Sequence, residues 1–521
     1  MAIIQIPIAS RGLTAEHDPS RIVTGDLVDA QNIDYTAGNL LQKDGGSTKF
    51  NSTVISGTPV VFEGNDWWPD TSTQKQILAT GDGKLLKFDM TGALEATLKS
   101  GLGSNKVTQF IAGGKETSGN NRKLFSVNGN DVIQVLSGNG VTTSNISSPP
   151  VEWTGTNQPT FGFLFRNCFV AGGNLNAPHR LYGSDAGDHE NLTTGGSFSL
   201  NIYPGDGQRL VAGLASITRA FLWKYPFGVY YIDDSTTTPT GWFAKPITHE
   251  FGSAPTPHSV IAIDNGILAF MSNTGDIILM QEGDGTLSGI QFVNLMKALN
   301  LRTFIQQNFN LARLDRTQLE WYEDKKQLHV IYAAIATTVE NRRLVFDFNS
   351  ERTRVSVVNK DVNESLWMVL DSTNIPRPFA GDNVGFVRKL DQTNRLVDGA
   401  AYTLIAQTVP HDFSDVQPEF MVKKLFYRLH MEYEATGNYD VGCEVTIDSR
   451  SIGTVYFNQS GTGAILSFTL PAVLGGNEIR RRSRDIGGEG YYLSLRLFES
   501  GPNNPKIARM WAEFDPLVPA R

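Results

Sequence analysis

The sequence predicts an all-β protein: a β-propeller of six to eight blades with an inserted amphipathic helix, followed by a C-terminal β-sandwich. Three observations lead to this fold class. Glycine supplies 51 of the 521 residues, about a tenth of the chain, which is typical of turn-rich β proteins. Charged residues make up only 19%, which argues against long charged helices and coiled coils. A strand–turn–strand pattern also recurs at a nearly constant interval through the middle of the chain.

The length of the chain predicts more than one domain. At 521 residues and 57.2 kDa the chain exceeds a single compact core, so we expect two or three domains. We predict an N-terminal arm over residues 1–50, the propeller over residues 51–400 and the sandwich over residues 401–521. Residues 408–420 are the expected linker between the last two.

Composition limits the classes of function. The net charge of −8 gives no general signature of nucleic-acid binding, so such binding would need a local basic stripe. No apolar run approaches the roughly 18 residues of a membrane span, and the apolar N-terminal stretch lacks the preceding basic residues of a signal peptide. Cys168 and Cys443 lie in apolar, strand-like runs, which predicts buried free thiols.

The repeat is the most informative pattern. Residues 77–98 read as three short strands joined by a Gly-Asp-Gly turn and a second turn, and residues 124–146 repeat this order with Asn-Gly in the turn. The first five anchors, each an apolar residue after a turn, are spaced by 47, 49, 48 and 48 residues, and the last two steps are 67 and 42. The anchors are Leu85, Val132, Leu181, Val229, Ile277, Leu344 and Phe386.

A period of this length with three to four short strands per unit is typical of a β-propeller. A four-stranded blade cannot cover both of its apolar faces alone, so neighbouring blades stack and close into a ring. Separate β-sandwich modules are the rival interpretation, but sandwiches of about 100 residues would give a period twice as long.

The long step contains the predicted helical insert, residues 289–316. Phe292, Leu295, Met296 and Leu299 follow the i, i+3, i+4, i+7 spacing of an amphipathic helix. Such a helix would pack on the propeller surface or dock on a neighbouring subunit. Residues 402–521 lose the period and contain six longer alternating runs, which favours an antiparallel sandwich.

The sequence carries no recognisable catalytic or cofactor motif. It has no phosphate-binding loop, no GxSxG and no HExxH, and its eight histidines never take a metal-ligand spacing. His179 and His189 share an acidic loop that we interpret as solvated, with a metal or acid–base cluster as the alternative. Trp67 and Trp68 predict an aromatic plug between blades, with a glycan platform as the alternative. We therefore predict no cofactor, no metal and no enzymatic activity.

A dense basic cluster is the one candidate contact site. Four arginines occur within five residues, after a Gly-Gly turn, which predicts that they project from a loop. A solvated loop with salt bridges is one interpretation; contact with an acidic subunit surface or with DNA phosphates is the other. The predicted contact residues are Arg480, Arg481, Arg482 and Arg484.

The opening segment DPSRIVTGDLVDAQNIDYTAGNLLQKDGG resembles the start of tailed-bacteriophage structural proteins, including the tail nozzle, or tail tubular B-like, proteins of short-tailed phages. The segment near the C-terminus, residues 490–516, is similar to the strand–loop–strand that closes such proteins. The matching N-terminal positions are Asp18, Pro19, Gly25, Asp26, Ala30, Asn32, Asp34, Gly38, Leu40, Lys43 and Gly45.

This resemblance implies a structural virion protein in a ring-shaped tail conduit through which the genome passes, with host-surface contact as a further expected role. The implied partners are copies of the chain in a cyclic homo-oligomer, a hexamer by preference, then adaptor or portal-proximal proteins, tail fibre proteins and passing DNA. The implied location is the virion tail, assembled in the host cytoplasm.

The alternative is a propeller that binds or cleaves glycans of host surface polysaccharide. Sialidase-type propellers carry repeated Ser-x-Asp-x-Gly-x-Thr-Trp boxes, and this sequence has none. Glycoside hydrolysis needs two carboxyl groups at a fixed separation. Carboxylates do stand at the repeat turns, where Asp also suits the turn itself; they are Asp82, Asp131, Asp185, Asp233, Asp276 and Asp347.

Overall fold

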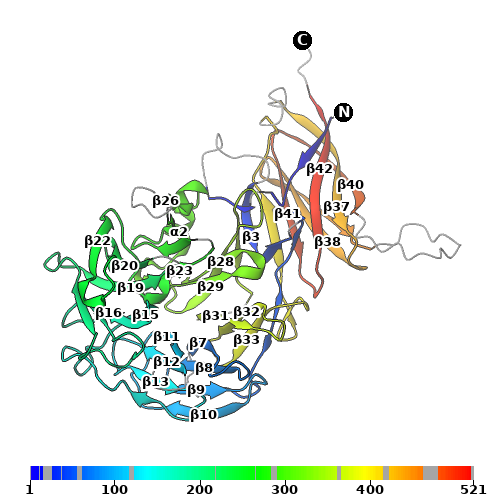
Figure 1. Ribbon diagram of the computed structural model, residues 1–521. Coiled ribbons are helices and arrows are strands. Elements are labelled where there is room, and N and C mark those ends of the chain that lie inside the picture. Colours follow the sequence, from blue (N-terminus) through cyan, green and yellow to red (C-terminus); the bar gives the residue numbers. More distant parts are fainter. Residues whose placement is uncertain are drawn as a thin grey trace.

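The computed structural model describes residues 2–10, 12–15, 26–36, 38–55, 61–115, 122–216, 219–264, 266–282, 290–360, 365–414, 422–460 and 479–517. Almost all regular structure in these ranges is β-strand, arranged as a propeller joined to a second, two-sheet part that carries both chain ends (Figure 1). The predicted all-β class and the propeller are confirmed. None of the helices in these ranges has the length and apolar character needed to cross a membrane.

Seven four-stranded units follow one another in the described chain, each antiparallel. Unit 1 contains β7 (Val61–Trp67), β8 (Lys75–Thr80), β9 (Leu85–Phe88) and β10 (Leu94–Lys99). Unit 2 contains β11 (Gln109–Lys115), β12 (Arg122–Val127), β13 (Gln134–Ser137) and β14 (Ser144–Asn145). Unit 3 contains β15 (Phe161–Phe165), β16 (Cys168–Gly172), β17 (Arg180–Gly183) and β18 (Phe198–Asn201). Unit 4 contains β19 (Arg209–Ala215), β20 (Ala220–Tyr225), β21 (Val229–Asp233) and β22 (Phe243–Thr248).

The remaining units complete the series. Unit 5 contains β23 (Val260–Ala262), β24 (Ile267–Met271), β25 (Ile277–Gln281) and β26 (Gln291–Asn294). Unit 6 contains β27 (Gln318–Tyr322), β28 (Gln327–Ala333), β29 (Glu340–Asp347) and β30 (Arg354–Val358). Unit 7 contains β31 (Ser365–Leu370), β32 (Pro376–Gly381), β33 (Val387–Gln392) and, from the N-terminal segment, β6 (Gly46–Lys49).

The first strand of each unit contacts the first strand of the next, and β31 of unit 7 contacts β7 of unit 1, so the series closes on itself. Closure uses the N-terminal segment, because β6 pairs with β33 and supplies the outermost strand of unit 7. The pair β34 (Leu396–Val397) and β35 (Ala400–Ala401) lies beside β6.

The predicted repeat positions mark equivalent points of the units. Leu85, Leu181, Val229, Ile277 and Leu344 all lie in the third strand of their unit. Val132 and Phe386 lie just before the third strand of units 2 and 7. The interval of about 48 residues between the first anchors in the sequence therefore corresponds to one four-stranded unit.

The helical insert is shorter than predicted. Gly289 lies outside the described residues, and Phe292 belongs to β26, because this segment pairs with β25 and completes unit 5. The helical part follows that strand and accounts for the long repeat step. It consists of α1 (Leu295–Ala298), α2 (Arg302–Asn308) and the 3-10 helix η5 (Leu311–Arg316).

The C-terminal part contains two sheets with a common core. One sheet has the order β4-β5-β42-β37-β40, with β1 beside β42; the other runs from β30 of unit 6 through β3, β36, β41 and β38 to β39. Side chains from both sheets, such as Met431 and Leu495, belong to one buried cluster. Its strands are β36 (Leu404–Thr408), β37 (Lys424–Glu434), β38 (Asp440–Ile447), β39 (Arg450–Asn458), β40 (Ile479–Gly490), β41 (Leu493–Glu499) and β42 (Lys506–Pro516).

The described residues of segment 1–50 are built into these sheets. β1 pairs with β42, β3 pairs with β36, and β5 pairs with both β4 and β42. The same sheet therefore continues from unit 6 across the predicted domain boundary at residue 401. These N-terminal strands are β1 (Ala2–Ile6), β2 (Gly12–Leu13), β3 (Asp26–Gln31), β4 (Ile33–Tyr35) and β5 (Leu41–Lys43). Of the predicted linker, residues 415–420 lie outside the described ranges.

Candidate functional site

The four arginines do not project from a loop, and that prediction is wrong. They lie in β40, which pairs along its length with β37. A strand can carry such a charge run because alternate side chains point to opposite faces of the sheet. The cluster is therefore divided between two faces.

Arg482 and Arg484 lie on the core side of β40, where Arg482 binds Tyr433 of its own sheet and both arginines bind residues at the edge of the opposite sheet. Arg482 donates from Nε to the Tyr433 hydroxyl at 2.7 Å and from Nη2 to Ser460 Oγ at 2.9 Å. Arg484 donates from Nε to the backbone carbonyl of Tyr456 in β39 at 2.6 Å. Edge strands leave backbone groups without a strand partner, and these guanidinium groups satisfy part of that edge.

Arg481 lies on the other face. Its guanidinium carbon is 5.2 Å from the ring centre of Trp511, and Arg509 lies 5.8 Å from the same ring. In the strand register Arg481 stands opposite Glu432, and Arg480 stands opposite Tyr433. Arg481 is thus the member that a partner can reach most directly, and its role in subunit contact remains a prediction.

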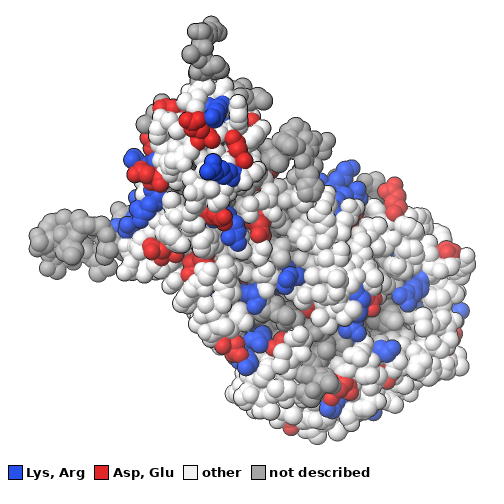
Figure 2. Space-filling model, turned by 180° about the vertical axis from the view of Figure 1, so that it is seen from behind, with Lys and Arg blue, Asp and Glu red and all other residues white. Residues whose placement is uncertain are grey.

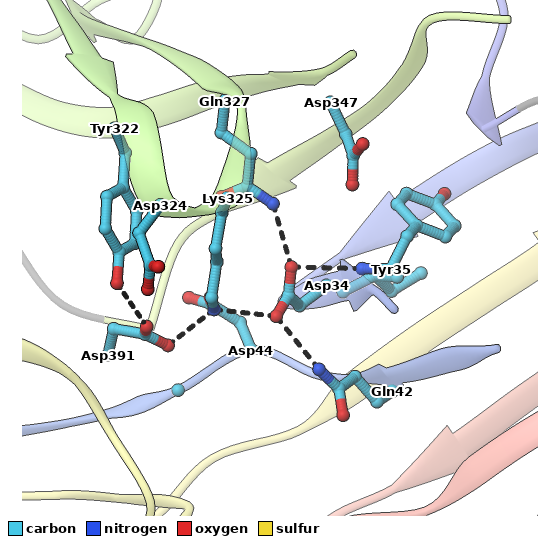
Figure 3. Close-up of polar contacts among 12 residues, drawn as sticks. Asp34, Tyr35, Gln42, Asp44, Tyr322, Asp324, Lys325, Gln327, Asp347 and Asp391 are labelled. Atoms are coloured by element: carbon cyan, nitrogen blue, oxygen red, sulfur yellow. Dashed lines mark hydrogen bonds and ion pairs between the residues drawn. The ribbon is translucent and has the colours of Figure 1, made fainter. Parts of the chain in front are cut away.

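A second candidate is a partly buried ionic cluster where the N-terminal segment meets units 6 and 7. Lys325, in the 3-10 helix η6 (Glu323–Lys325), places its Nζ 2.8 Å from Asp34 Oδ2 and 2.6 Å from Asp391 Oδ1 (Figure 3). Gln327 donates to Asp34 at 2.8 Å, and the Tyr322 hydroxyl donates to Asp391 at 2.9 Å. Burial alone would lower the pKa of Lys325, but the charges of Asp34 and Asp391 raise it above its usual range.

Asp44 adds a third carboxylate to this cluster. Its Oδ2 lies 2.6 Å from Lys360 Nζ and 3.4 Å from Arg343 Nη2. Burial alone would raise the pKa of Asp44, but Lys360 and Arg343 hold it well below its usual range. The cluster therefore keeps its charges paired inside the protein, as buried charges require.

The same three carboxylates could in principle hold a metal. The ligand atoms of Asp34, Asp44 and Asp391 lie within 4.8 Å of one another, and carboxylate oxygens suit hard divalent cations. However, the ammonium groups of Lys325 and Lys360 already occupy the positions next to these oxygens. The residues present fit a structural ion-pair cluster that joins distant parts of the chain.

A third group of titratable side chains lies at the centre of the ring. His258, just before β23, has its Nε2 3.2 Å from Glu63 Oε2 in unit 1 and 3.2 Å from the carbonyl oxygen of Thr108 before unit 2. Burial, together with the charge of Glu320, raises the pKa of Glu63 well above its usual range, and burial alone raises that of Glu320 to about 8. Burial lowers the pKa of His258 to about 4. Both directions favour uncharged forms, so at neutral pH the 3.2 Å contact joins a carboxyl group to a neutral imidazole.

Sequence reasoning missed both clusters. Glu63 shares its strand with Asp66, Glu320 is the one acid of its strand, and nothing in their spacing indicates that the ring brings Glu63 next to His258. The sequence marks Asp34 only as a position of the N-terminal resemblance. The available signal is its charge between the apolar residues Ile33 and Tyr35, since charged side chains are seldom fully buried without a partner.

The predicted alternatives for histidines and tryptophans are resolved by local contacts. The interpretation of the acidic loop as solvated is wrong for His189, which is fully buried with its Nε2 3.2 Å from the backbone oxygen of Asn167. Among the described residues, three metal-ligating side chains converge only at the Asp34 cluster, so His179 and His189 form no such group. Trp67 is fully buried and donates to the Gly138 carbonyl of unit 2 at 3.0 Å, as expected for an aromatic plug.

Several turn carboxylates already have partners, either within their own turns or in an ion pair. Asp82 accepts a hydrogen bond from Thr80 at 2.5 Å, and Asp233 accepts one from the backbone of Ser235 at 3.0 Å. Asp276 pairs with Arg302 at 2.9 Å. These contacts account for three of the residues that the sequence offered as candidate glycosidase acids.

Comparisons with known proteins add no assignment. No protein-family model matches the chain, and no curated protein matches it. A computationally designed protein, Ika8, is similar over 66% of this chain and 99% of its own, with 10% identity and a TM-score of 0.38. YCF48 bound to D1 peptide is similar over 70% of this chain and 97% of its own, with 10% identity and a TM-score of 0.42. These TM-scores are too low to contribute to the argument.

Proposed function

We propose that this protein is a structural virion protein, a subunit of the ring-shaped tail conduit of a short-tailed bacteriophage. In this proposal the seven four-stranded units are the seven blades of one propeller, and the paired C-terminal sheets are a β-sandwich. The partners are copies of the chain in a cyclic homo-oligomer, preferably a hexamer, together with adaptor or portal-proximal proteins, tail fibre proteins and passing DNA. The protein would reside in the virion tail and contact the host surface.

One observation carries the proposal: residues that define the phage-like N-terminal motif are buried contacts of the fold. Asn32 and Asp34 are each 3% exposed, and Lys43 is fully buried. Asn32 donates to the carbonyl of Thr403 at 2.7 Å, Asp34 binds Lys325, and Lys43 binds Glu499 at 2.8 Å. The motif therefore specifies the junction between the propeller and the C-terminal sheets. A chain that shares the motif is expected to share that junction.

The junction also suits an assembly subunit mechanically. Strands from segment 1–50 close unit 7 and complete both C-terminal sheets, so the two parts are tied together by backbone pairing. A rigid body with two different faces can form a head-to-tail ring that closes.

The charge distribution is compatible with a conduit wall. The net charge is −8, and on the face seen in Figure 2 basic and acidic side chains are interspersed without a broad basic stripe. DNA could pass such a wall without strong electrostatic retention.

Sedimentation velocity of the purified full chain tests the proposal. We expect a discrete species whose mass is a small multiple of 57.2 kDa, six by preference, besides free subunits. A chain that stays monomeric at all attainable concentrations and releases sugars from bacterial surface polysaccharide would contradict the proposal and support the glycan-cleaving alternative.

A further inference from the structure

The outer face of the six-stranded C-terminal sheet has an ordered charge pattern. Leu429, Met431, Met510 and Ala512 of β37 and β42 point into the core, so the residues that alternate with them lie on the outer face. The register of β1, β42, β37 and β40 sets these residues in rows across the sheet.

Three rows define the outer face. The central row consists of Gln5, Trp511, His430 and Ser483. The row on one side consists of Arg509, Glu432 and Arg481. The row on the other side consists of Ile3, Glu513, Arg428 and Asp485.

The sign of the charge reverses across the central row in each of the three long strands. β42 has Arg509 on one side and Glu513 on the other, and β37 has Glu432 on the first side and Arg428 on the second. β40 follows the same rule with Arg481 and Asp485. Neighbouring charges within the chain also pair, as between Arg509 and Glu432 at 2.5 Å.

This pattern is complementary to itself. If a second copy is turned by half a turn about an axis along the central row, each strand faces the same strand running in the opposite direction. Arg509 then faces Glu513, Glu432 faces Arg428, and Arg481 faces Asp485, each pair occurring twice. We propose that the outer face is an isologous docking surface for a second copy of this chain.

The centre of the face has the composition of an interface anchor. The guanidinium groups of Arg481 and Arg509 lie 5.2 and 5.8 Å from the ring centre of Trp511, and the buried Nε1 of Trp511 has no hydrogen-bond partner among the described residues. Tryptophan and arginine are the residues most often found at energetic centres of interfaces. Ile3, 51% exposed, adds an apolar contact beside them.

The size of the face is sufficient for a dimer. β37, β40 and β42 have 11, 12 and 11 residues. At about 3.3 Å per residue and about 4.8 Å between strands, these strands and β1 cover on the order of 600 Å². A specific interface buries about 600–1,000 Å² on each partner, so this face reaches the lower end of that range.

A different axis would fit less well. A two-fold axis that runs parallel to the strands, between β42 and β37, also places Arg509 of one copy opposite Glu432 of the other. With this axis β40 faces β1, so Arg481 and Asp485 have no charged residue opposite them. The axis along the central row uses all three strands.

A symmetric crosslink tests the geometry directly. Residues of the central row face their own copies, so Ser483→Cys should be joined to itself by a bismaleimide that spans about 10 Å, the usual distance between packed sheets. Cys168 and Cys443 are buried, so the new thiol would be the reactive one. Ser451→Cys, exposed in β39 of the other sheet, is the matched control and should yield no crosslinked pair.

Charge exchange provides the second test. Arg509→Glu and Glu513→Arg should each weaken association roughly tenfold or more, because like charges then meet twice. The variant that carries both substitutions restores Arg–Glu pairs between the two copies. Within each chain, however, the carboxylate introduced by Arg509→Glu lies beside the carboxylate of Glu432. This combined variant should therefore regain association while being less stable than the unchanged protein.

The outcomes separate this proposal from the proposed function. If the Ser483→Cys variant forms rings, and its new thiol reacts with the bismaleimide without joining two subunits, the docking face is overturned and the conduit proposal stays intact. A combined variant that associates no better than the single variants would also overturn it. Crosslinked pairs without rings would support the docking face and count against the conduit.

Discussion

Lys325 and Asp34 are 291 positions apart in the sequence, yet the Lys325 ammonium lies 2.8 Å from the buried carboxylate of Asp34. This contact joins unit 6 of the propeller to the strand β4 of the N-terminal segment. The arrangement explains why a segment of the first 50 residues can hold two parts of the protein in a fixed relation.

Lys325→Met should destabilise the protein strongly. The substitution preserves much of the side-chain volume but leaves Asp34 and Asp391 without their shared cation. Removing one partner of a buried ion pair costs about 3 kcal/mol or more in the free energy of unfolding. Urea unfolding measures this change. Lys326→Met is the control, because Lys326 pairs with Asp264 at the surface and should cost at most about 1 kcal/mol. Equal effects of the two variants would contradict the assigned role of Lys325.

Gly46→Ala should weaken the closure of unit 7. A Cβ at Gly46 in β6 would overlap the carbonyl oxygens of Asn394 and Leu396. Forcing an additional methyl group into a filled site costs about 1–3 kcal/mol. The control is Gly487→Ala in β40, where nothing lies within 4 Å of the added atom. Thermal unfolding should show a lower Tm for the first variant only, and an unchanged Tm for both would refute closure by β6.

The arginine cluster should divide into two classes in stability measurements. Arg482→Met removes the donors to Tyr433 and Ser460 and should lower the free energy of unfolding by about 1–2 kcal/mol. Arg481→Met, on the outer face, should change it by less than about 0.5 kcal/mol. Guanidinium chloride titration of the two variants checks the order, and the reverse order would show that the faces are assigned wrongly.

Glu320 should make the stability of the protein depend on pH. Burial raises its folded-state pKa to about 8, whereas the unfolded chain releases the proton near pH 4.5. The folded state then binds more protons between these values, so the free energy of unfolding falls as pH rises from about 4.5 to about 8. Glu320→Gln removes this titrating group, so the slope of the free energy of unfolding against pH should become shallower by up to about 1.4 kcal/mol per pH unit. Identical slopes for the variant and the unchanged protein between about pH 5 and about pH 8 would contradict the assignment.

The repeat could be predicted because it is local. Hairpin turns and alternating strands leave their period in the sequence, and anchors such as Leu181 and Val229 fall at the same point of neighbouring units. The N-terminal pairings could not be predicted in this way. The register of Ile4 with Ala512 depends on contacts between opposite ends of the chain, which no local pattern records.

The candidate site was predictable only in part. The arginine run is visible in the sequence, but the preceding Gly-Gly turn predicts a loop, because the sequence does not show that β37 offers a partner strand with Glu432 opposite Arg481. The clusters around Lys325 and around His258 arise from tertiary packing. Their members lie far apart in the sequence, in the N-terminal segment and in several units, and only docking of that segment and closure of the ring bring them together.

Electron microscopy of the purified full chain tests the central claim most directly. The account predicts closed rings with cyclic symmetry and a central opening, built from whole 57.2 kDa subunits. Class averages that contain only isolated subunits or isolated pairs, at concentrations where the protein remains folded, would contradict it.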